Sequence, residues 1–340
     1  MLRTTVVGSW PPAKEFEHDL QRYHRGELVP NDAEALLRNV AARAIRQQRE
    51  CGLDQYTGGE TSADTFILHF PNWFSGLEPL DPTAWDGRGT YRVTGSFNAS
   101  QGLGIARAYR REKGIDATIT KVTIPGPSEI TMLIEPEAER PALWDTVINL
   151  IRQEMYACCD LGARDIQLDL PHIAMGLVDQ KWNWTTARAV DVIQRIFDNV
   201  DGVRRSVHFC YGDFGAQTWT EHRSFHPLLP TIQALDGIVD RVVLEFSLPE
   251  QWAERALLAA IPANMEVAAG IVDVKSPDIE TVSELQYKIY SLLEYLPASR
   301  LLICPSCGLG RRTPELAIGK AMTMVQAVRA VDAELAAQIE

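Results

Sequence analysis

Short runs of β-branched and apolar residues recur along the chain, mostly with helical patterns between them, and this alternation constrains the fold more than any other feature. Eight such runs begin near residues 4, 55, 117, 165, 206, 241, 266 and 300. Apolar strands that alternate with helices are typical of a parallel sheet covered on both faces. Eight units of this kind predict an α/β protein, with a (β/α)₈ TIM barrel as a single domain over residues 1–340.

One segment does not fit a barrel unit. Residues 70–105 are rich in Trp, Pro and Gly and follow the second predicted strand. We therefore expect an insertion there, with a hairpin around Tyr91, Arg92 and Val93.

Net charge, apolar runs and cysteine spacing indicate which binding partners and which cellular compartment to expect. The formal net charge of -12 argues against nucleic acid or an anionic membrane surface as a partner. The sequence has no signal-peptide pattern and no apolar run of the roughly 18 residues that a membrane span needs. Its six cysteines lack the spacing of a small disulfide-bonded domain, so we expect reduced thiols and a cytoplasmic protein.

Polar residues follow the predicted strands at their C-terminal ends, where a barrel carries its active site. They are Ser9, Glu60, Asp169, His208, Cys210, Glu245, Asp273 and Cys307. His208 and Cys210 are two apart on one strand and therefore share a face. An imidazole and a thiol side by side suit zinc, which takes nitrogen and sulfur ligands. The alternative is a buried histidine bonded to backbone beside a buried cysteine.

Several motifs occur in the same order as in one known family. They are Thr4 to Ser9, Gly59-Glu60, Gly126-Pro127, Asp169-x-Pro171, His208-x-Cys210, Glu245 and Pro305 to Leu309. With them the chain resembles the C-terminal catalytic barrel of cobalamin-independent methionine synthase, in its short, core-only form. The resemblance implies zinc held by His208, Cys210, Glu245 and Cys307. Cys304 matches no ligand of the family, and we interpret it as a buried thiol.

The resemblance also implies contacts with homocysteine. Val7, Gly8 and Ser9 would contact the amino-acid end, and Glu60 and Asp169 would accept its ammonium group. The alternative for these two carboxylates is an ion pair with Arg or Lys.

The chain departs from the family pattern near the expected methyl donor. The family's D-E-P reads Asp169-Leu170-Pro171, its R-E-G reads Ala174-Met175-Gly176, and a tryptophan beside the pterin falls at Leu133. Its histidine, which protonates the folate leaving group, falls at Lys275. Lys275, with Asp273, is the candidate catalytic pair, but a lysine serves as an acid near pH 7 only if burial lowers its pKa. The alternative is an ion pair of Lys275 with Asp273 or Glu280.

The resemblance implies a zinc-dependent S-methyltransferase that makes methionine from homocysteine. The donor is a methyl-corrinoid, free or protein-bound, or methyltetrahydrofolate. One alternative is a zinc-dependent thiol alkyltransferase that resembles epoxyalkane:coenzyme M transferase. Another is a barrel like that of uroporphyrinogen decarboxylase, without zinc. Zinc content separates the last class from the others, and homocysteine affinity separates the two transferases.

Overall fold

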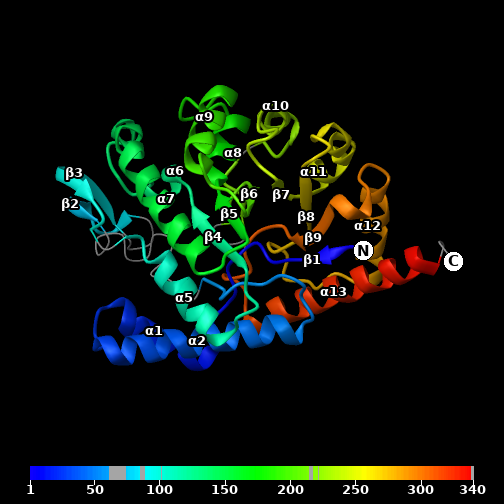
Figure 1. Ribbon diagram of the computed structural model, residues 1–340, viewed down its shortest axis with the longest axis horizontal. Helices are drawn as coiled ribbons and strands as arrows, with labels where there is room; N and C mark the ends of the chain where they lie inside the picture. The colour runs from blue at the N-terminus through cyan, green and yellow to red at the C-terminus, as the bar shows by residue number, and fades with distance from the viewer. Residues whose placement is uncertain (61–73, 85–88, 101, 214–216, 221, 338–340) are drawn as a thin grey trace.

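A curved parallel sheet forms the centre of the molecule, with helices around its outside (Figure 1). The computed structural model describes residues 1–60, 74–84, 89–100, 102–213, 217–220 and 222–337. Seven strands form the sheet, in the order β1-β9-β8-β7-β6-β5-β4, and all neighbours run parallel. This arrangement confirms the predicted α/β barrel architecture.

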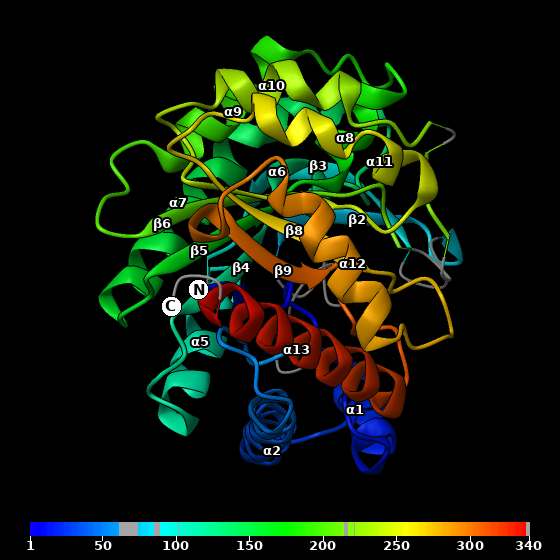
Figure 2. The same cartoon turned by 90° about the vertical axis from the view of Figure 1, so that its right-hand side faces the viewer.

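The strands are β1 (Arg3–Thr4), β2 (Ser75–Asp81), β3 (Thr90–Asn98), β4 (Lys121–Pro125), β5 (Asp165–Asp169), β6 (Arg204–Phe209), β7 (Arg241–Glu245), β8 (Glu266–Val272) and β9 (Leu301–Pro305). The helices are α1 (Glu17–His24), α2 (Pro30–Glu50), α5 (Ile105–Ile115), α6 (Pro127–Ile130), α7 (Trp144–Asp160), α8 (Pro171–Val178), α9 (Thr186–Phe197), α10 (Leu229–Ala234), α11 (Pro249–Ala253), α12 (Val282–Leu293) and α13 (Pro314–Ala337). Helix α13 packs against α12, α2, β1 and β9, and closes the lower side of the sheet in Figure 2.

The predicted second strand, near residue 55, is reduced to a single bridge between Thr5 and Gln55. The cause lies in the preceding residue. The Asp54 carboxylate accepts the backbone N–H of Thr4 at 2.7 Å and its hydroxyl at 2.8 Å, so a side chain replaces a strand carbonyl in the ladder. Only Gln55 N–H still donates to Thr4 O, at 3.1 Å.

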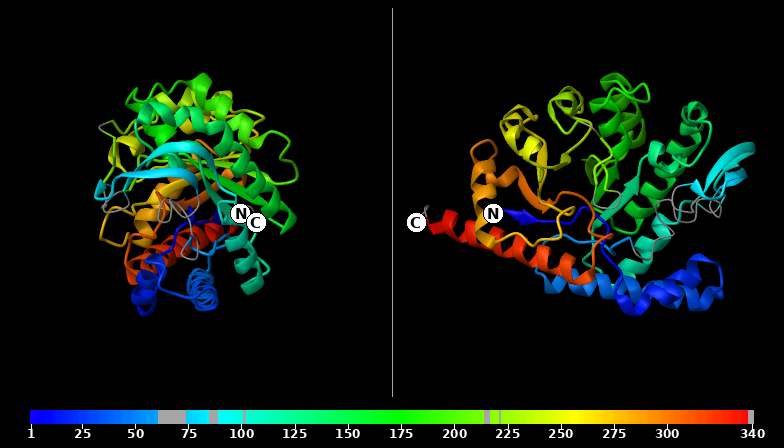
Figure 3. Two further views of the ribbon diagram at one scale, coloured as in Figure 1. Left: turned by 90° about the vertical axis from the view of Figure 1, so that its left-hand side faces the viewer. Right: turned by 180° about the vertical axis from the view of Figure 1, so that it is seen from behind.

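The segment 70–105 contains an antiparallel pair, β2 with β3, at the edge of the molecule away from both termini (Figures 1 and 3). Residues 70–73, 85–88 and 101 of this segment lie outside the described residues. Tyr91 joins β3 to the segment after α6, because its N–H donates to Leu133 O and its carbonyl accepts from Glu135 N–H. Leu133 itself is fully buried.

The sheet register brings the predicted site residues to one end of the barrel. Asp169, the last residue of β5, is opposite His208 of β6. Glu245, the last residue of β7, is opposite Gly270 of β8. Below this end, the barrel interior is filled by Val7, Val243, Ala268, Leu302 and Cys304. Among the described helices, none combines the length and the apolar character that crossing a membrane requires.

Candidate functional site

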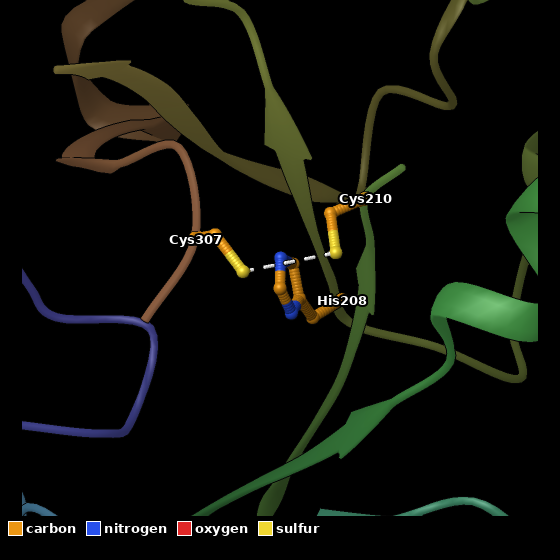
Figure 4. A group of neighbouring side chains, drawn as sticks. All are labelled: His208, Cys210 and Cys307. Atoms are coloured by element: carbon orange, nitrogen blue, oxygen red, sulfur yellow. Dashed lines mark hydrogen bonds between the residues drawn. The ribbon is translucent and has the colours of Figure 1, made fainter. Parts of the chain in front are cut away.

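Three side chains with metal-binding atoms converge at the C-terminal ends of β6 and β9. The ligand atoms of His208, Cys210 and Cys307 lie within 4.8 Å of one another. Figure 4 shows the imidazole and the two sulfurs pointing toward a common centre. His208 and Cys210 lie on the same side of their strand, as their spacing predicted, and Cys307 comes from the turn after β9.

The geometry of this group fits zinc. The two sulfurs are 3.9 Å apart. Two thiolates on one tetrahedral zinc, each at about 2.3 Å, would stand roughly 3.8 Å apart. The Nε2 atom of His208 is buried and has no hydrogen-bond partner among the described residues. A buried imidazole nitrogen without a partner is costly unless it receives a ligand, so this donor set suits a metal ion.

A carboxylate orients the histidine from its other side. His208 Nδ1 lies 3.2 Å from Asp169 Oδ1, and Gln167 Nε2 donates to the same oxygen at 2.8 Å. Gln167 also donates to Val7 O at 2.9 Å. A carboxylate on the second ring nitrogen is the usual arrangement around a metal-binding histidine, because it leaves Nε2 free for the metal. Asp169 therefore orients His208 and also lines the hollow described below.

The two thiols differ in acidity. The hydrogen bond from Cys210 lowers the pKa of Cys307 to about 7, and the charges of His208 and Lys275 act in the same direction. The same hydrogen bond and burial raise the pKa of Cys210 well above its ordinary value. Burial alone would lower the pKa of His208, but the hydrogen bond and charge of Asp169 raise it above its ordinary value. Of the two thiols, Cys307 therefore loses its proton first, near neutral pH.

A glycine in β8 allows Cys307 to reach this position. A Cβ on Gly270 would lie 2.6 Å from Ser306 Cα and 2.9 Å from Leu244 O. Only a residue without a side chain lets the turn after β9 approach β8 so closely. Ser306 then fastens the turn, since its N–H donates to Val272 O at 2.8 Å and its hydroxyl accepts from Val274 N–H at 3.2 Å.

The expected fourth ligand, Glu245, lies outside this metal-binding group of described residues. Its Oε1 atom is 2.5 Å from Lys275 Nζ, and its Oε2 atom accepts the N–H of Tyr211 at 3.3 Å. The sequence analysis gave an ion pair of Lys275 with Asp273 or Glu280 as the alternative. Both pairings are wrong, because Lys275 pairs with Glu245. Asp273 instead accepts the backbone N–H of Lys275 at 2.9 Å and donates its own N–H to Glu280.

Four of the five residues predicted to contact the amino-acid end, all except Gly8, line a hollow of about 190 Å³ that also includes His208, Cys210 and Cys307. The four are Val7, Ser9, Glu60 and Asp169. Gly8 makes room for Glu60, because a Cβ on Gly8 would meet Glu60 Oε1 at 2.1 Å. Glu60 adopts a left-handed backbone with φ 57, and Thr123 donates to its carboxylate at 2.6 Å. Burial and the neighbouring Asp169 raise the pKa of Glu60 to about 7.

The sequence analysis did not predict two further charged residues of the hollow. Arg311 and Asp213 both line it, and Asp213 pairs with Arg312 at 3.0 Å. Both follow predicted strand ends: Asp213 comes three residues after Cys210, and Arg311 four after Cys307. A charged residue within four positions after a predicted strand end is the sequence signal that could have identified both.

A second hollow of about 350 Å³ opens beside the first. Its walls include Trp144, Trp182, Trp184 and His172, and His172 directly follows Pro171, which lines the first hollow. Trp144 and Trp184 stack with their ring centroids 5.1 Å apart. Burial lowers the pKa of His172 to about 4, so its ring is neutral near pH 7.

Several proteins that are similar to this chain in sequence or in fold carry methionine synthase names. The methionine synthases of Saccharolobus solfataricus and Sulfolobus acidocaldarius are each 26% identical to this chain, over 98% of it and 96% and 94% of their own lengths. A B12-independent methionine synthase from Shewanella sp. W3-18-1, solved with selenomethionine, shares the fold with a TM-score of 0.79 at 19% identity, covering 99% of both chains. A putative B12-independent methionine synthase from Listeria monocytogenes superimposes with a TM-score of 0.70 at 18% identity, over 97% of this chain and 99% of its own.

A family profile covers nearly the whole chain. The profile described as "Cobalamin-independent synthase, Catalytic domain" matches residues 2–330. This match confirms the resemblance found in the motifs. The chain belongs to the cobalamin-independent methionine synthase family and corresponds to its catalytic domain.

Proposed function

We propose that this protein is a zinc-dependent methyltransferase that methylates the sulfur of homocysteine and releases methionine. The observation that carries the proposal is the group of His208, Cys210 and Cys307. Its sulfurs are 3.9 Å apart, and the buried Nε2 of His208 has no hydrogen-bond partner in the part of the chain that the structure describes. Zinc, when bound there, keeps a substrate thiol deprotonated at neutral pH. Relatives that align over nearly their whole length are named methionine synthase, which supports homocysteine as the substrate.

The hollow beside the metal group supports an amino acid as the thiol substrate. Homocysteine carries an ammonium and a carboxylate besides its sulfur. Glu60 and Asp169 supply acceptors for the ammonium, and Arg311 supplies a cation for the carboxylate. These charges hold the substrate sulfur toward Cys210 and Cys307, so that it meets the donor in a fixed orientation.

In the reaction, the substrate sulfur donates an electron pair to the methyl carbon, and the donor leaves with the pair of the broken bond. A folate donor also needs a proton on its leaving nitrogen, whereas a methyl-corrinoid does not. Lys275 is poorly suited to give that proton. Although burial would lower its pKa, the Glu245 carboxylate raises it above its ordinary value. We therefore propose that donors whose leaving group needs no proton react faster, and that the tryptophan-lined hollow receives the donor.

The test is a donor screen with homocysteine, using isotopically labelled methyl groups and mass spectrometry of the product. We expect labelled methionine from zinc-loaded protein, with faster turnover from methylcobalamin than from methyltetrahydrofolate. Brisk turnover with methyltetrahydrofolate alone would contradict the donor preference. Absence of methionine with either donor, together with alkylation of simple thiols by epoxides, would replace the proposed reaction by the alkyltransferase alternative.

Glu60→Gln is expected to weaken homocysteine binding roughly tenfold or more, because a charge-assisted hydrogen bond contributes about 1.5–3 kcal/mol. Calorimetry on zinc-loaded protein measures the effect. The matched control is 4-mercaptobutyrate, which is homocysteine without its amino group, and its affinity should not fall in the variant. If the variant lost equal affinity for both thiols, Glu60 would not bind the ammonium group of homocysteine.

A further inference from the structure

The hollow lined by Trp144, Trp182 and Trp184 also has the imidazole of His172 in its wall. The imidazole lies edge-on to Trp182, with ring centroids 5.4 Å apart, and the histidine side chain is 10% exposed. Its Nδ1 atom is buried and has no hydrogen-bond partner among the described residues. Glu129 Oε1 is 3.7 Å from Nδ1, beyond hydrogen-bond distance, and accepts the backbone N–H of His172 at 2.9 Å instead. The imidazole therefore keeps hydrogen-bonding capacity that a ligand in the hollow can use.

The charge state of His172 limits which ligands suit it. Burial lowers its pKa to about 4, and the charge of Arg140 acts in the same direction, so the ring is neutral near pH 7. A neutral imidazole offers one N–H donor and one acceptor nitrogen. The hydroxyls in the same wall already donate elsewhere, Ser128 to Glu129 at 2.8 Å and Thr131 to a backbone carbonyl at 2.8 Å. His172 thus suits an uncharged ring edge that carries donors and acceptors.

The three tryptophans differ in what they leave open to a ligand. Trp144 and Trp184 stack on each other, and the guanidinium of Arg188 lies 4.6 Å and 4.8 Å from their ring centroids. Trp182 is 38% exposed, so part of its ring is available. Trp182 and Asn183 both have left-handed backbones, with φ 56 and 54, which residues other than glycine rarely adopt. Arg188 Nη1 enforces this conformation by donating to the carbonyls of both residues, at 3.1 Å and 3.2 Å.

This aromatic surface is not the one that the family pattern predicts. The family's tryptophan falls at Leu133, which is fully buried and does not belong to the wall of the hollow. Trp184 reaches the wall because α8 has a glycine against it, since a Cβ on Gly176 would lie 2.1 Å from Trp184 Cδ1. The aromatic rings of the hollow therefore come from the start of α7 and from the segment after α8.

We propose that the hollow binds a planar nitrogen heteroaromatic ring, which stacks on Trp182 and hydrogen-bonds through its edge to His172. A volume of about 350 Å³ has room for a bicyclic ring of this kind. Aromatic stacking holds the face of such a ring, and the imidazole recognises the nitrogen atoms of its edge. The pterin of methyltetrahydrofolate and the benzimidazole of methylcobalamin both have this chemistry. The inference rests on the proposed function only in taking the ring to be part of the methyl donor.

Equilibrium dialysis of the purified protein with pterin, with dimethylbenzimidazole and with naphthalene tests the inference without turnover. Naphthalene is a bicyclic ring without nitrogen. We expect saturable binding of at least one of the two heterocycles, and the one that binds more tightly identifies the class of donor. Trp182→Ala should weaken the binding of that heterocycle and of naphthalene roughly tenfold, because both lose the stacking surface. His172→Phe should weaken the heterocycle roughly three- to tenfold and leave naphthalene unchanged, because only the heterocycle loses a hydrogen bond.

Two further variants serve as controls. His172→Gln keeps a donor and an acceptor on its amide, so it should recover most of the heterocycle affinity that His172→Phe loses. Tyr287 is an aromatic residue of α12 that is 65% exposed and lies outside the wall of the hollow, so Tyr287→Ala should bind the rings as the parent does. The inference is overturned if the parent binds neither heterocycle saturably, or if the affinity for the heterocycle is unchanged in both Trp182→Ala and His172→Phe.

Failure of this inference and failure of the proposed function give different results. A parent that makes methionine but binds neither heterocycle rejects only the ring site. A parent that shows the expected pattern of ring affinities, yet makes no methionine, rejects only the reaction.

Discussion

Cys307→Ser is expected to abolish stoichiometric zinc binding and to reduce methionine formation by more than roughly 100-fold, because it removes one of the proposed protein ligands. Serine is nearly the same size as cysteine, but its hydroxyl is a poor zinc ligand at neutral pH. The Cys210 thiol would also lose its partner at 3.9 Å. Elemental analysis of protein purified without chelator should give about one zinc per chain for the parent and nearly none for the variant.

Cys304→Ser is the matched control for this change. Cys304 precedes Cys307 by three residues and is fully buried, but it packs against Val7, Val243 and Ala268 in the barrel interior. Its thiol lies outside the metal-binding group of described residues, so the control should keep its zinc. Full zinc in Cys307→Ser, or equal zinc loss in both variants, would contradict the assignment.

Most of the fold could be predicted from the strand pattern, because buried parallel strands are continuous apolar runs. Asp165–Asp169 and Arg241–Glu245 lie within a residue of their predicted positions. The strand predicted near residue 117 begins at Lys121. The run at residue 55 departs furthest from the prediction, since its pairing depends on the side chain of Asp54, which competes for the N–H of Thr4. Pattern alone does not reveal a carboxylate that takes the place of a backbone acceptor.

The site was predictable to the extent that strand geometry and motif order determine it. The spacing of His208 and Cys210 places both side chains on one face, and the structure brings Cys307 to them. The pairing of Lys275 with Glu245 was not predictable, because the two residues lie 30 positions apart and meet only across neighbouring strand ends. Sequence showed which groups reach this end of the barrel, and packing decided which of them pair.

The carboxyl group of Glu112 is expected to make the protein less stable as the pH rises from about 4.5 to about 7. Burial raises the pKa of Glu112 in the folded protein from 4.5 to about 7. The folded state then binds a proton that the unfolded chain has already lost, so the stability contributed by this group is complete below about pH 4.5 and is lost as the pH passes through about 7. Glu60 and Glu129 have pKa values raised to about 7 by burial and act in the same direction.

Glu112→Gln should make the free energy of unfolding depend less on pH between about 4.5 and 7. It should also stabilise the protein at pH 8 by up to roughly 3 kcal/mol, since each pKa unit corresponds to about 1.4 kcal/mol. The amide oxygen can still accept the N–H of Gly58, which the carboxylate accepts at 3.2 Å. Urea unfolding at pH 5, 6, 7 and 8 measures the free energy of unfolding for the parent, for Glu112→Gln and for Glu139→Gln. Glu139 is an exposed carboxylate, so its replacement should leave the slope unchanged. A Glu112→Gln profile parallel to that of the parent would show that this carboxyl group is already ionised in the folded protein at pH 5.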